Sequence, residues 1–227
     1  MNIGRVIEDN VGRFGEYDYL YFEGKRHTNI EMNCMANRLG NALKNLGIRR
    51  GDRVGLQVFN CPQIMQGFFA AWKIGAIVVP INPSLRSSEL AYIYNDSGIR
   101  ILVTSVEYLG RIEEARRQAT ELEKVIITDA DDVPGAIPYK KLAEQNSDKL
   151  VIEDTDNDDI AALLYTAGTT GRPKGVMLSH YTLYTHLSGY YEMMLDTRGI
   201  LVKGVAREWY VKQGEIVDRE VEVFGIN

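Results

Sequence analysis

The sequence predicts an α/β fold, a layered domain with a mostly parallel sheet flanked by helices. Stretches with the apolar period of a helix alternate along the chain with short apolar runs rich in β-branched residues. One of these runs, residues 76–81, is apolar throughout, which is typical of a strand buried on both faces of a parallel sheet. Around residue 170, a stretch rich in glycine and threonine separates two further apolar runs and predicts a loop between two antiparallel strands.

The first elements are expected to be a short helix and then a strand over residues 17–22, which ends in a turn at residues 23–24. Thr28 and Glu31 have the spacing of a capping box, so a long helix is expected to start there and to stop at Gly47. The apolar positions of that helix recur on one face, which indicates that its methionines belong to the core rather than to a ligand surface. These positions are Met32, Met35, Ala36, Leu39, Ala42, Leu43 and Leu46.

The middle of the chain continues the alternation of strands and helices. Asn60 is the expected cap of a second helix with Pro62 in its first turn, and a third helix is expected to begin at Ser87 or Ser88. A further helix is expected over residues 106–119. The expected strands cover residues 51–59, 76–81, 99–104 and 124–128.

Two polar segments interrupt this pattern. Residues 129–138 are expected to form a loop, because they combine several aspartates with two prolines and a glycine. The acidic run at residues 153–159 could hold magnesium, but metal ligands normally converge from several elements. A solvated linker that also caps an element is therefore the favoured interpretation.

The composition is that of an ordinary globular chain: 227 residues, 45% of them hydrophobic and 25% charged, enough for one large domain or two small ones. The formal net charge is −5 and no basic run stands out, so nucleic-acid binding is not favoured. Cys34 and Cys61 indicate neither a zinc site nor a disulfide framework, and a reducing cytoplasm is the expected compartment. No stretch has the pattern of a transmembrane segment or a signal peptide.

The most informative stretch is LLYTAGTTGRPK, residues 163–174. Glycines let a backbone fold around a ligand with its N–H groups pointing inward, while hydroxyls add donors and a lysine adds positive charge, so the stretch suits a polyphosphate. The P-loop of ordinary nucleotidases has a different spacing, since Gly168, Gly171 and Lys174 are three residues apart and Pro173 precedes the lysine. The alternative without a ligand is a Gly/Thr-rich surface turn in a hairpin.

Residue for residue, this stretch resembles the phosphate-loop signature of the acyl-adenylate-forming synthetases, the AMP-binding superfamily. The blocks GDRVGLQVFNCPQ, FFAAWKIGAIVVPINPSL and ELAYIYNDSGIRILVTS are similar to the N-terminal half of the large domain of acyl-CoA synthetases, most of all the long-chain fatty-acid–CoA ligases. The resemblance implies that residues 1–195 are the N-terminal portion of such a large domain. Residues 196–227 are then a divergent tail of unassigned structure, in which alternating apolar positions over 210–223 would allow a hairpin.

The resemblance also implies a reaction and a site. A carboxylic acid, with a fatty acid favoured, would be activated by ATP as acyl-AMP and transferred to coenzyme A, with Mg²⁺ taking part but no residue assigned as a metal ligand. Lys174 is the implied catalytic residue, which neutralises the leaving pyrophosphate, and Gly171 and Gly175 are the expected pivots of loop closure. The implied ATP-binding residues are Thr166, Ala167, Gly168, Thr169, Thr170, Gly171 and Lys174.

Blocks that this family carries later in its sequence, which contact adenine and ribose and supply a further lysine, are not found in these residues. The chain is therefore expected to be a fragment of an acyl-CoA synthetase, with a complementing C-terminal chain as a partner. Two other hypotheses stay open: an adenylating enzyme that activates an aryl or amino acid, and a non-catalytic remnant that binds only a nucleotide or a partner.

Three further expectations concern the surroundings of the loop. Residues 167–175 are expected to be poorly ordered without a ligand, because a Gly/Thr loop has few apolar anchors. Ser179 is the expected cap of a helix that runs to Met194. His180 is expected to have a structural role near the start of that helix rather than to act as a general base, since no nucleophile or carboxylate partner is evident beside it.

Overall fold

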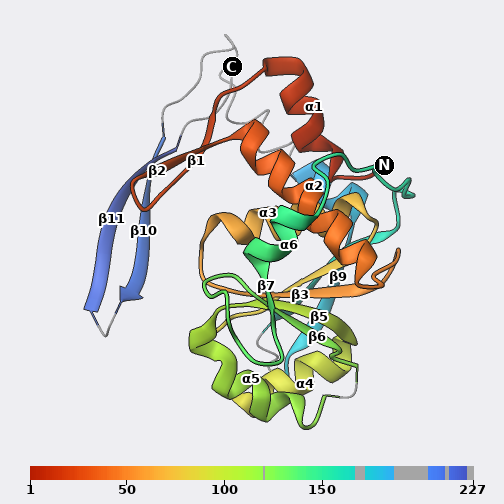
Figure 1. The fold of residues 1–227 in the computed structure, drawn as a ribbon, viewed down its shortest axis with the longest axis vertical. Helices are drawn as coiled ribbons and strands as arrows, with labels where there is room; N and C mark the ends of the chain where they lie inside the picture. Colours follow the sequence, from red (N-terminus) through yellow and green to blue (C-terminus); the bar gives the residue numbers. More distant parts are fainter. Residues whose placement is uncertain (120, 167–171, 187–203, 213–214, 224–227) are drawn as a thin grey trace.

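The computed structural model describes residues 1–119, 121–166, 172–186, 204–212 and 215–223. A seven-stranded sheet lies between two layers of helices, which confirms the predicted α/β class (Figure 1). Two antiparallel hairpins form sheets of their own. They are β1 (Asp18–Phe22) with β2 (Lys25–Thr28), and β10 (Gly204–Lys212) with β11 (Glu215–Val223).

The seven-stranded sheet has the strand order β7-β6-β5-β3-β4-β8-β9. Neighbouring strands are parallel from β7 to β8, and the last pair, β8 and β9, is antiparallel. Because β8 is parallel to β4, it ends at the same edge of the sheet as the other parallel strands, where open α/β sheets bind their ligands. The strands are β3 (Arg53–Gln57), β4 (Ile77–Pro80), β5 (Ile99–Thr104), β6 (Lys124–Ile127), β7 (Ile137–Pro138), β8 (Ile160–Thr166) and β9 (Lys174–Ser179).

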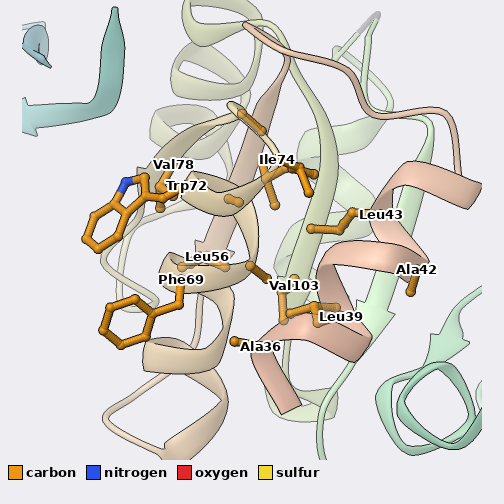
Figure 2. Close-up of a cluster of buried hydrophobic side chains, with 14 of the residues drawn as sticks. Ala36, Leu39, Ala42, Leu43, Leu56, Phe69, Trp72, Ile74, Val78 and Val103 are labelled. Carbon is orange, nitrogen blue, oxygen red and sulfur yellow. The ribbon is translucent and has the colours of Figure 1, made fainter. Parts of the chain in front are cut away.

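One face of the sheet is covered by four helices, which enclose the larger of two apolar cores (Figure 1). Figure 2 shows this core, where Leu39 and Leu43 of the long helix α2 lie across from Val103 and Leu56 of the sheet. Burial of each leucine contributes about 1.5–3 kcal/mol, so this layer is a main source of stability. The four helices are α1 (Arg5–Phe14), α2 (Asn29–Asn45), α3 (Pro62–Lys73) and α6 (Tyr139–Gln145).

The opposite face is covered by α4 (Ser87–Ser97) and α5 (Leu109–Arg116), which enclose the second core. In Figure 1 these two helices lie below the sheet, away from the other four. Among the buried members of the second core, Leu90 and Tyr94 come from α4, Ile112 from α5 and Leu102 from β5. Leu163 and Tyr165 of β8 pack against this core, so α4 lies against the strand that carries the Gly/Thr-rich signature.

Several local predictions are confirmed by the contacts at the element ends. The capping box of α2 is present, since Thr28 Oγ1 accepts a hydrogen bond from Glu31 N–H and Thr28 N–H donates to the Glu31 carboxylate. Beyond the end of α2, Gly47 has a φ of 98°, a left-handed value that favours glycine. Ser179 caps the last described helix, because its Oγ accepts from Thr182 N–H at 3.1 Å.

Other boundaries differ from the predictions. The cap of α3 is Cys61 rather than Asn60, because the residue before Pro62 is forced into the extended conformation that an N-cap requires. The helix predicted over residues 106–119 begins as a 3₁₀ turn, Val106–Tyr108, and its α-helical part ends at Arg116.

Some short elements were not predicted from the sequence. The predicted loop over residues 129–138 ends in the two-residue strand β7, and α6 follows it directly. Strand β2 had not been predicted, although it pairs with β1 through the expected turn. The C-terminal hairpin starts at Gly204, earlier than the alternation in residues 210–223 indicated. Of the helix predicted to run to Met194, residues 180–186 are helical and the rest lies outside the described residues.

Within the part of the chain that the structure describes, none of the helices combines the length and the hydropathy needed to cross a membrane.

Candidate functional site

The candidate site is the end of the β8–β9 hairpin. The two strands are antiparallel, as predicted, and their register places Thr166 opposite Lys174 and Tyr165 opposite Gly175. Thr166 and Lys174 are both exposed, so the structure brings a hydroxyl and an ammonium group together at the carboxyl edge of the sheet. These two residues are called the loop ends below. The hairpin can thus hold a ligand-binding loop by both of its ends.

The other predicted site residues, Ala167, Gly168, Thr169, Thr170 and Gly171, lie outside the described residues. The expected poor order over residues 167–175 can be compared with the structure only from Arg172 onward. Lys174 and Gly175 are members of β9 and pair with β8, so the expectation is wrong for these two residues. A ladder of paired residues holds them in spite of the glycine.

The root of the hairpin is fixed in the core. Ala161 and Ala162 of β8 are buried, and Ala162 pairs with Val78 of the parallel strand β4. The indole Nε1–H of Trp72, on α3, donates to Ala161 O at 2.9 Å. Burial decreases along β8 towards Thr166, so the strand runs from a rigid interior to a solvent-exposed end.

The helix α4 contacts the chain on both sides of the loop. The Tyr165 hydroxyl donates to Asp96 Oδ2 at 2.6 Å, and the Tyr92 hydroxyl lies 3.5 Å from Asp96 Oδ1. The guanidinium carbon of Arg172 lies 5.7 Å from the centroid of the Tyr92 ring. Burial raises the pKa of Tyr165, and the neighbouring carboxylate raises it further, so the phenol keeps the proton that it donates.

Sequence reasoning missed these α4 residues as parts of the site. Asp96 and Tyr165 are 69 positions apart, and no periodic pattern connects them. The two tyrosines and the aspartate look like ordinary positions of an amphipathic helix and a strand. Their relationship to the loop follows only from the packing of α4 against β8.

His180 lies at the other end of β9 and is completely buried. Its Nδ1 accepts a hydrogen bond from Ile3 N–H at 3.2 Å, and its Nε2 has no hydrogen-bond partner among the described residues. Burial lowers the pKa of His180 to about 4; Asp159 opposes this shift, while the N-terminal amine and Arg50 favour it. The imidazole is therefore neutral near pH 7 and shielded from solvent, which agrees with the expected structural role.

The acidic run before β8 is engaged in ion pairs and backbone contacts. Arg50 pairs with Asp159 at 2.5 Å and with Asp156 at 3.3 Å, and Asp159 also accepts from Asp156 N–H. Arg5 of α1 pairs with Asp154 at 3.1 Å. In the described residues, no group of three or more histidine, cysteine, aspartate or glutamate side chains could hold a metal ion. The run is a linker in the structure, and it also caps the last described helix, because the carbonyls of Asp159 and Asn157 accept from His180 and Tyr181 N–H, as the sequence favoured.

Comparison with known proteins finds relatives that match most of the chain. A family model described as AMP-binding enzyme matches residues 7–203. A crotonobetaine/carnitine–CoA ligase from Salmonella enteritidis is 36% identical over 201 residues, which are 84% of this chain and 38% of the relative. The chain therefore spans well under half the length of the curated relatives that it matches.

Two solved structures are similar in fold as well as in sequence. The anthranilate CoA ligase AuaEII, solved with anthranoyl-AMP, has a TM-score of 0.74 and 30% identity over 80% of this chain and 34% of its own. A fatty acyl CoA synthetase from Mycobacterium tuberculosis has a TM-score of 0.75 and 26% identity, covering 84% of this chain and 37% of its own.

Proposed function

The chain belongs to the AMP-binding enzyme family, and from this we propose that it is the N-terminal part of an AMP-forming acid–thiol ligase, an ATP-dependent acyl-CoA synthetase. One observation carries the proposal. The register of the β8–β9 hairpin sets Thr166 opposite Lys174 at the carboxyl edge of the sheet, so both ends of the signature loop face the region where a nucleotide would bind.

The proposed first step makes an acyl-adenylate. A carboxylate oxygen of the acid attacks the α-phosphorus of ATP and forms a new P–O bond. The bond from that phosphorus to the oxygen bridging to the β-phosphate breaks, and pyrophosphate leaves with the electron pair. Negative charge grows on the leaving group, so catalysis requires fixed donors and positive charge around the β- and γ-phosphates.

We assign the stabilisation of this negative charge to the residues of the signature loop. Lys174 neutralises the leaving pyrophosphate, and the hydroxyl of Thr166 donates to a phosphate oxygen. The backbone and hydroxyl groups of Ala167, Gly168, Thr169, Thr170 and Gly171 complete the phosphate site. Mg²⁺ would enter with the ATP phosphates, and we assign it no ligand from this chain.

In the proposed second step, the thiol of coenzyme A loses its proton to solvent and its sulfur attacks the acyl carbonyl carbon. The bond from that carbon to the phosphate oxygen of AMP breaks, and AMP leaves with the electron pair. The blocks that hold adenine and ribose in this family are not among these 227 residues. We therefore propose that the reaction needs a complementing C-terminal portion of the ligase, and that the whole acts in the cytoplasm.

The identity of the acid depends on that portion. A fatty acid is our first candidate, supported by the similarity to the mycobacterial fatty acyl CoA synthetase. An aryl acid is the second, supported by the similarity to the anthranilate CoA ligase, which has the higher sequence identity of the two.

Exchange of labelled pyrophosphate into ATP tests the proposal, because it reports adenylation without requiring coenzyme A. The chain is assayed alone and together with the C-terminal portion of a related ligase, against a panel of fatty, aryl and amino acids. We expect exchange that depends on one class of acid, and only in the combined sample. Robust acid-dependent exchange by the chain alone would show that the complementing portion is not required. An absence of exchange and of ATP binding in both samples would contradict the proposal and favour the hypothesis of a non-catalytic remnant.

A further inference from the structure

A single helix, α4, contacts the polypeptide close to both loop ends, at Tyr165 and at Arg172. Tyr165 immediately precedes the first loop end, and its hydroxyl donates to Asp96 at 2.6 Å. Arg172 lies two residues before the second loop end, and its guanidinium carbon lies 5.7 Å from the ring centroid of Tyr92. Tyr92 and Asp96 are one helical turn apart, so they lie on the same face of α4. The face that carries them is directed at the loop end of the hairpin.

The Tyr165 side chain is confined on its other side by β9. Gly175 is its partner in the ladder, and a Cβ atom built on Gly175 would lie 3.3 Å from Cζ of Tyr165 and 3.3 Å from Cδ1 of Leu163. The phenol therefore lies close to the backbone of β9, and a side chain at position 175 would press on the Tyr165 ring. Gly175, which sequence reasoning assigned as a pivot, serves in this structure as the contact surface for the Tyr165 ring.

The contact of the Tyr165 ring with Gly175 links β9 to the strand and helix beside it, and β9 has few other neighbours. In the described sheet, β9 is an edge strand with β8 as its one neighbour, and its side chains Val176 and Met177 are exposed. An edge strand is held by one ladder of hydrogen bonds and frays more readily than a central strand. A hydrogen bond to an ionised carboxylate is about twice as strong as a neutral one, so the Tyr165–Asp96 contact is well suited to hold the hairpin against α4.

We propose that Tyr92 and Asp96 are positioning residues for the phosphate loop. Acting through Arg172 and Tyr165, they hold the two loop ends at the separation and orientation that a nucleotide polyphosphate requires. They touch the loop's flanks and not the ligand. This inference rests on the proposed function, since the phosphates of ATP are the ligand that it concerns.

The test uses the full 227-residue chain and two measurements. The first is the dissociation constant for MgATP, measured by calorimetric titration. The second is the rate of limited trypsin cleavage after Lys174, which reports local opening of the hairpin; Arg172 is followed by proline and resists the enzyme. The variants are Asp96→Ala, Asp96→Asn and Tyr165→Phe. The matched control is Glu113→Gln, which removes an equivalent exposed carboxylate from α5, where it pairs with Arg116 at 3.7 Å.

We expect Asp96→Ala and Tyr165→Phe each to weaken ATP binding roughly tenfold, the effect of losing one charge-assisted hydrogen bond, and to speed cleavage after Lys174. Asp96→Asn keeps an oxygen that accepts from Tyr165, so it should restore part of the affinity. The double variant Asp96→Ala with Tyr165→Phe should bind no more weakly than either single variant, because both remove the same contact. The melting temperature should stay close to that of the control throughout.

The possible failures are distinct. If the unchanged chain binds ATP and Asp96→Ala binds it equally well, the positioning role is overturned while the proposed function stands. If neither the unchanged chain nor its combination with the C-terminal portion binds ATP, the failure belongs to the proposed function, and the positioning role falls with it. If only the combination binds ATP, the same variants are compared in that combination. If the variants lose affinity only in proportion to a lowered melting temperature, the α4 contact is merely structural and the inference is overturned.

Discussion

At the residue scale, the proposed chemistry depends most on Lys174. Its side chain is exposed at the first position of β9, and its backbone pairs with Thr166. Because this side chain is exposed, removing it should cost the fold little. A lysine at the loop end of the β8–β9 ladder is well placed to meet charge that develops on a leaving group.

We expect Lys174→Ala to lower the rate of ATP–pyrophosphate exchange by roughly a hundredfold to a thousandfold in the combined ligase, by analogy with loss of one transition-state donor. ATP binding should weaken much less, because the charge acts mainly on the departing pyrophosphate. Lys140→Ala, which removes an exposed lysine of α6, is the matched control. Should Lys174→Ala leave the rate intact and lower the melting temperature instead, the lysine would be structural.

His180 makes a second prediction at this scale, which concerns pH. The pKa of the imidazole is about 4 in the fold and about 6.5 in the unfolded chain, so the unfolded chain binds a proton first as the pH falls. Acidification through this window therefore favours unfolding, by on the order of 3 kcal/mol at its lower end. The neutral ring accepts from Ile3 N–H through Nδ1, and a proton placed there would oppose that donor.

The measurement is the free energy of unfolding in urea at pH 7 and at pH 4.5, for the unchanged chain and for His180→Asn. The asparagine oxygen can still accept from Ile3 N–H but does not titrate, so the variant should lose less stability on acidification. His186→Asn, at an exposed helical position, is the control and should lose as much as the unchanged chain. Equal pH dependence in all three proteins would contradict the assignment.

At the element scale, three helices are joined through one buried lysine. Lys73, at the end of α3, is completely buried, and its Nζ donates to Glu8 of α1 at 2.9 Å and to Asn37 of α2 at 2.6 Å. It also donates to Asn33 of α2. Burial lowers the pKa of Lys73, and the hydrogen bond and charge of Glu8 raise it in opposition. The carboxylate thus makes a charged lysine tolerable in the interior.

We expect Glu8→Gln to destabilise the chain by about 3 kcal/mol, because it leaves the Lys73 ammonium buried without a counter-ion. Adding Lys73→Met should recover part of that loss. The side chains at positions 8 and 73 are then both uncharged, and methionine has nearly the volume of the lysine that it replaces. Urea denaturation of the two single variants and the double variant gives the coupling energy. Additive losses in the double variant would mean that the two residues do not act as a pair.

At the scale of the whole molecule, the two cores place the sheet and its helices in one body, whereas the C-terminal hairpin pairs within itself. The strands β10 and β11 form a separate two-stranded sheet with nine registered pairs. We retain the division of the chain at residues 195 and 196 as a proposal. It predicts that the last 32 residues, 196–227, contribute little to the stability of the α/β layers.

A chain truncated after residue 195 should therefore melt within about 2 °C of the full chain, since about 1 kcal/mol corresponds to 2–4 °C for a protein of this size. It should also bind ATP with the same affinity, because the signature and its α4 contacts are retained. Differential scanning calorimetry and ATP titration are sufficient to decide. A fall of more than roughly 5 °C would mean that the tail packs on the domain.

The features that could be read from the sequence are those set by near neighbours. The capping box of Thr28 and Glu31 and the cap at Ser179 need only residues three positions away, and they are present as predicted. The β8–β9 hairpin follows from two apolar runs on either side of a short glycine-rich stretch. The cap of α3 was predicted at Asn60 but lies at Cys61. A local rule still explains it, because Pro62 forces the residue before it into the extended conformation of a cap.

The sequence by itself thus determined the α/β class, the order of the main helices and strands, and the position of the signature loop between two antiparallel strands. Only the tertiary structure decided which helix lies against that hairpin, that Gly175 lies against the Tyr165 ring, and that Lys73 is buried beside Glu8. The physical reason is the range of the interactions. Capping and alternation depend on neighbours within a turn or a strand, whereas the contact of Asp96 with Tyr165 spans 69 positions and exists only because α4 packs on β8.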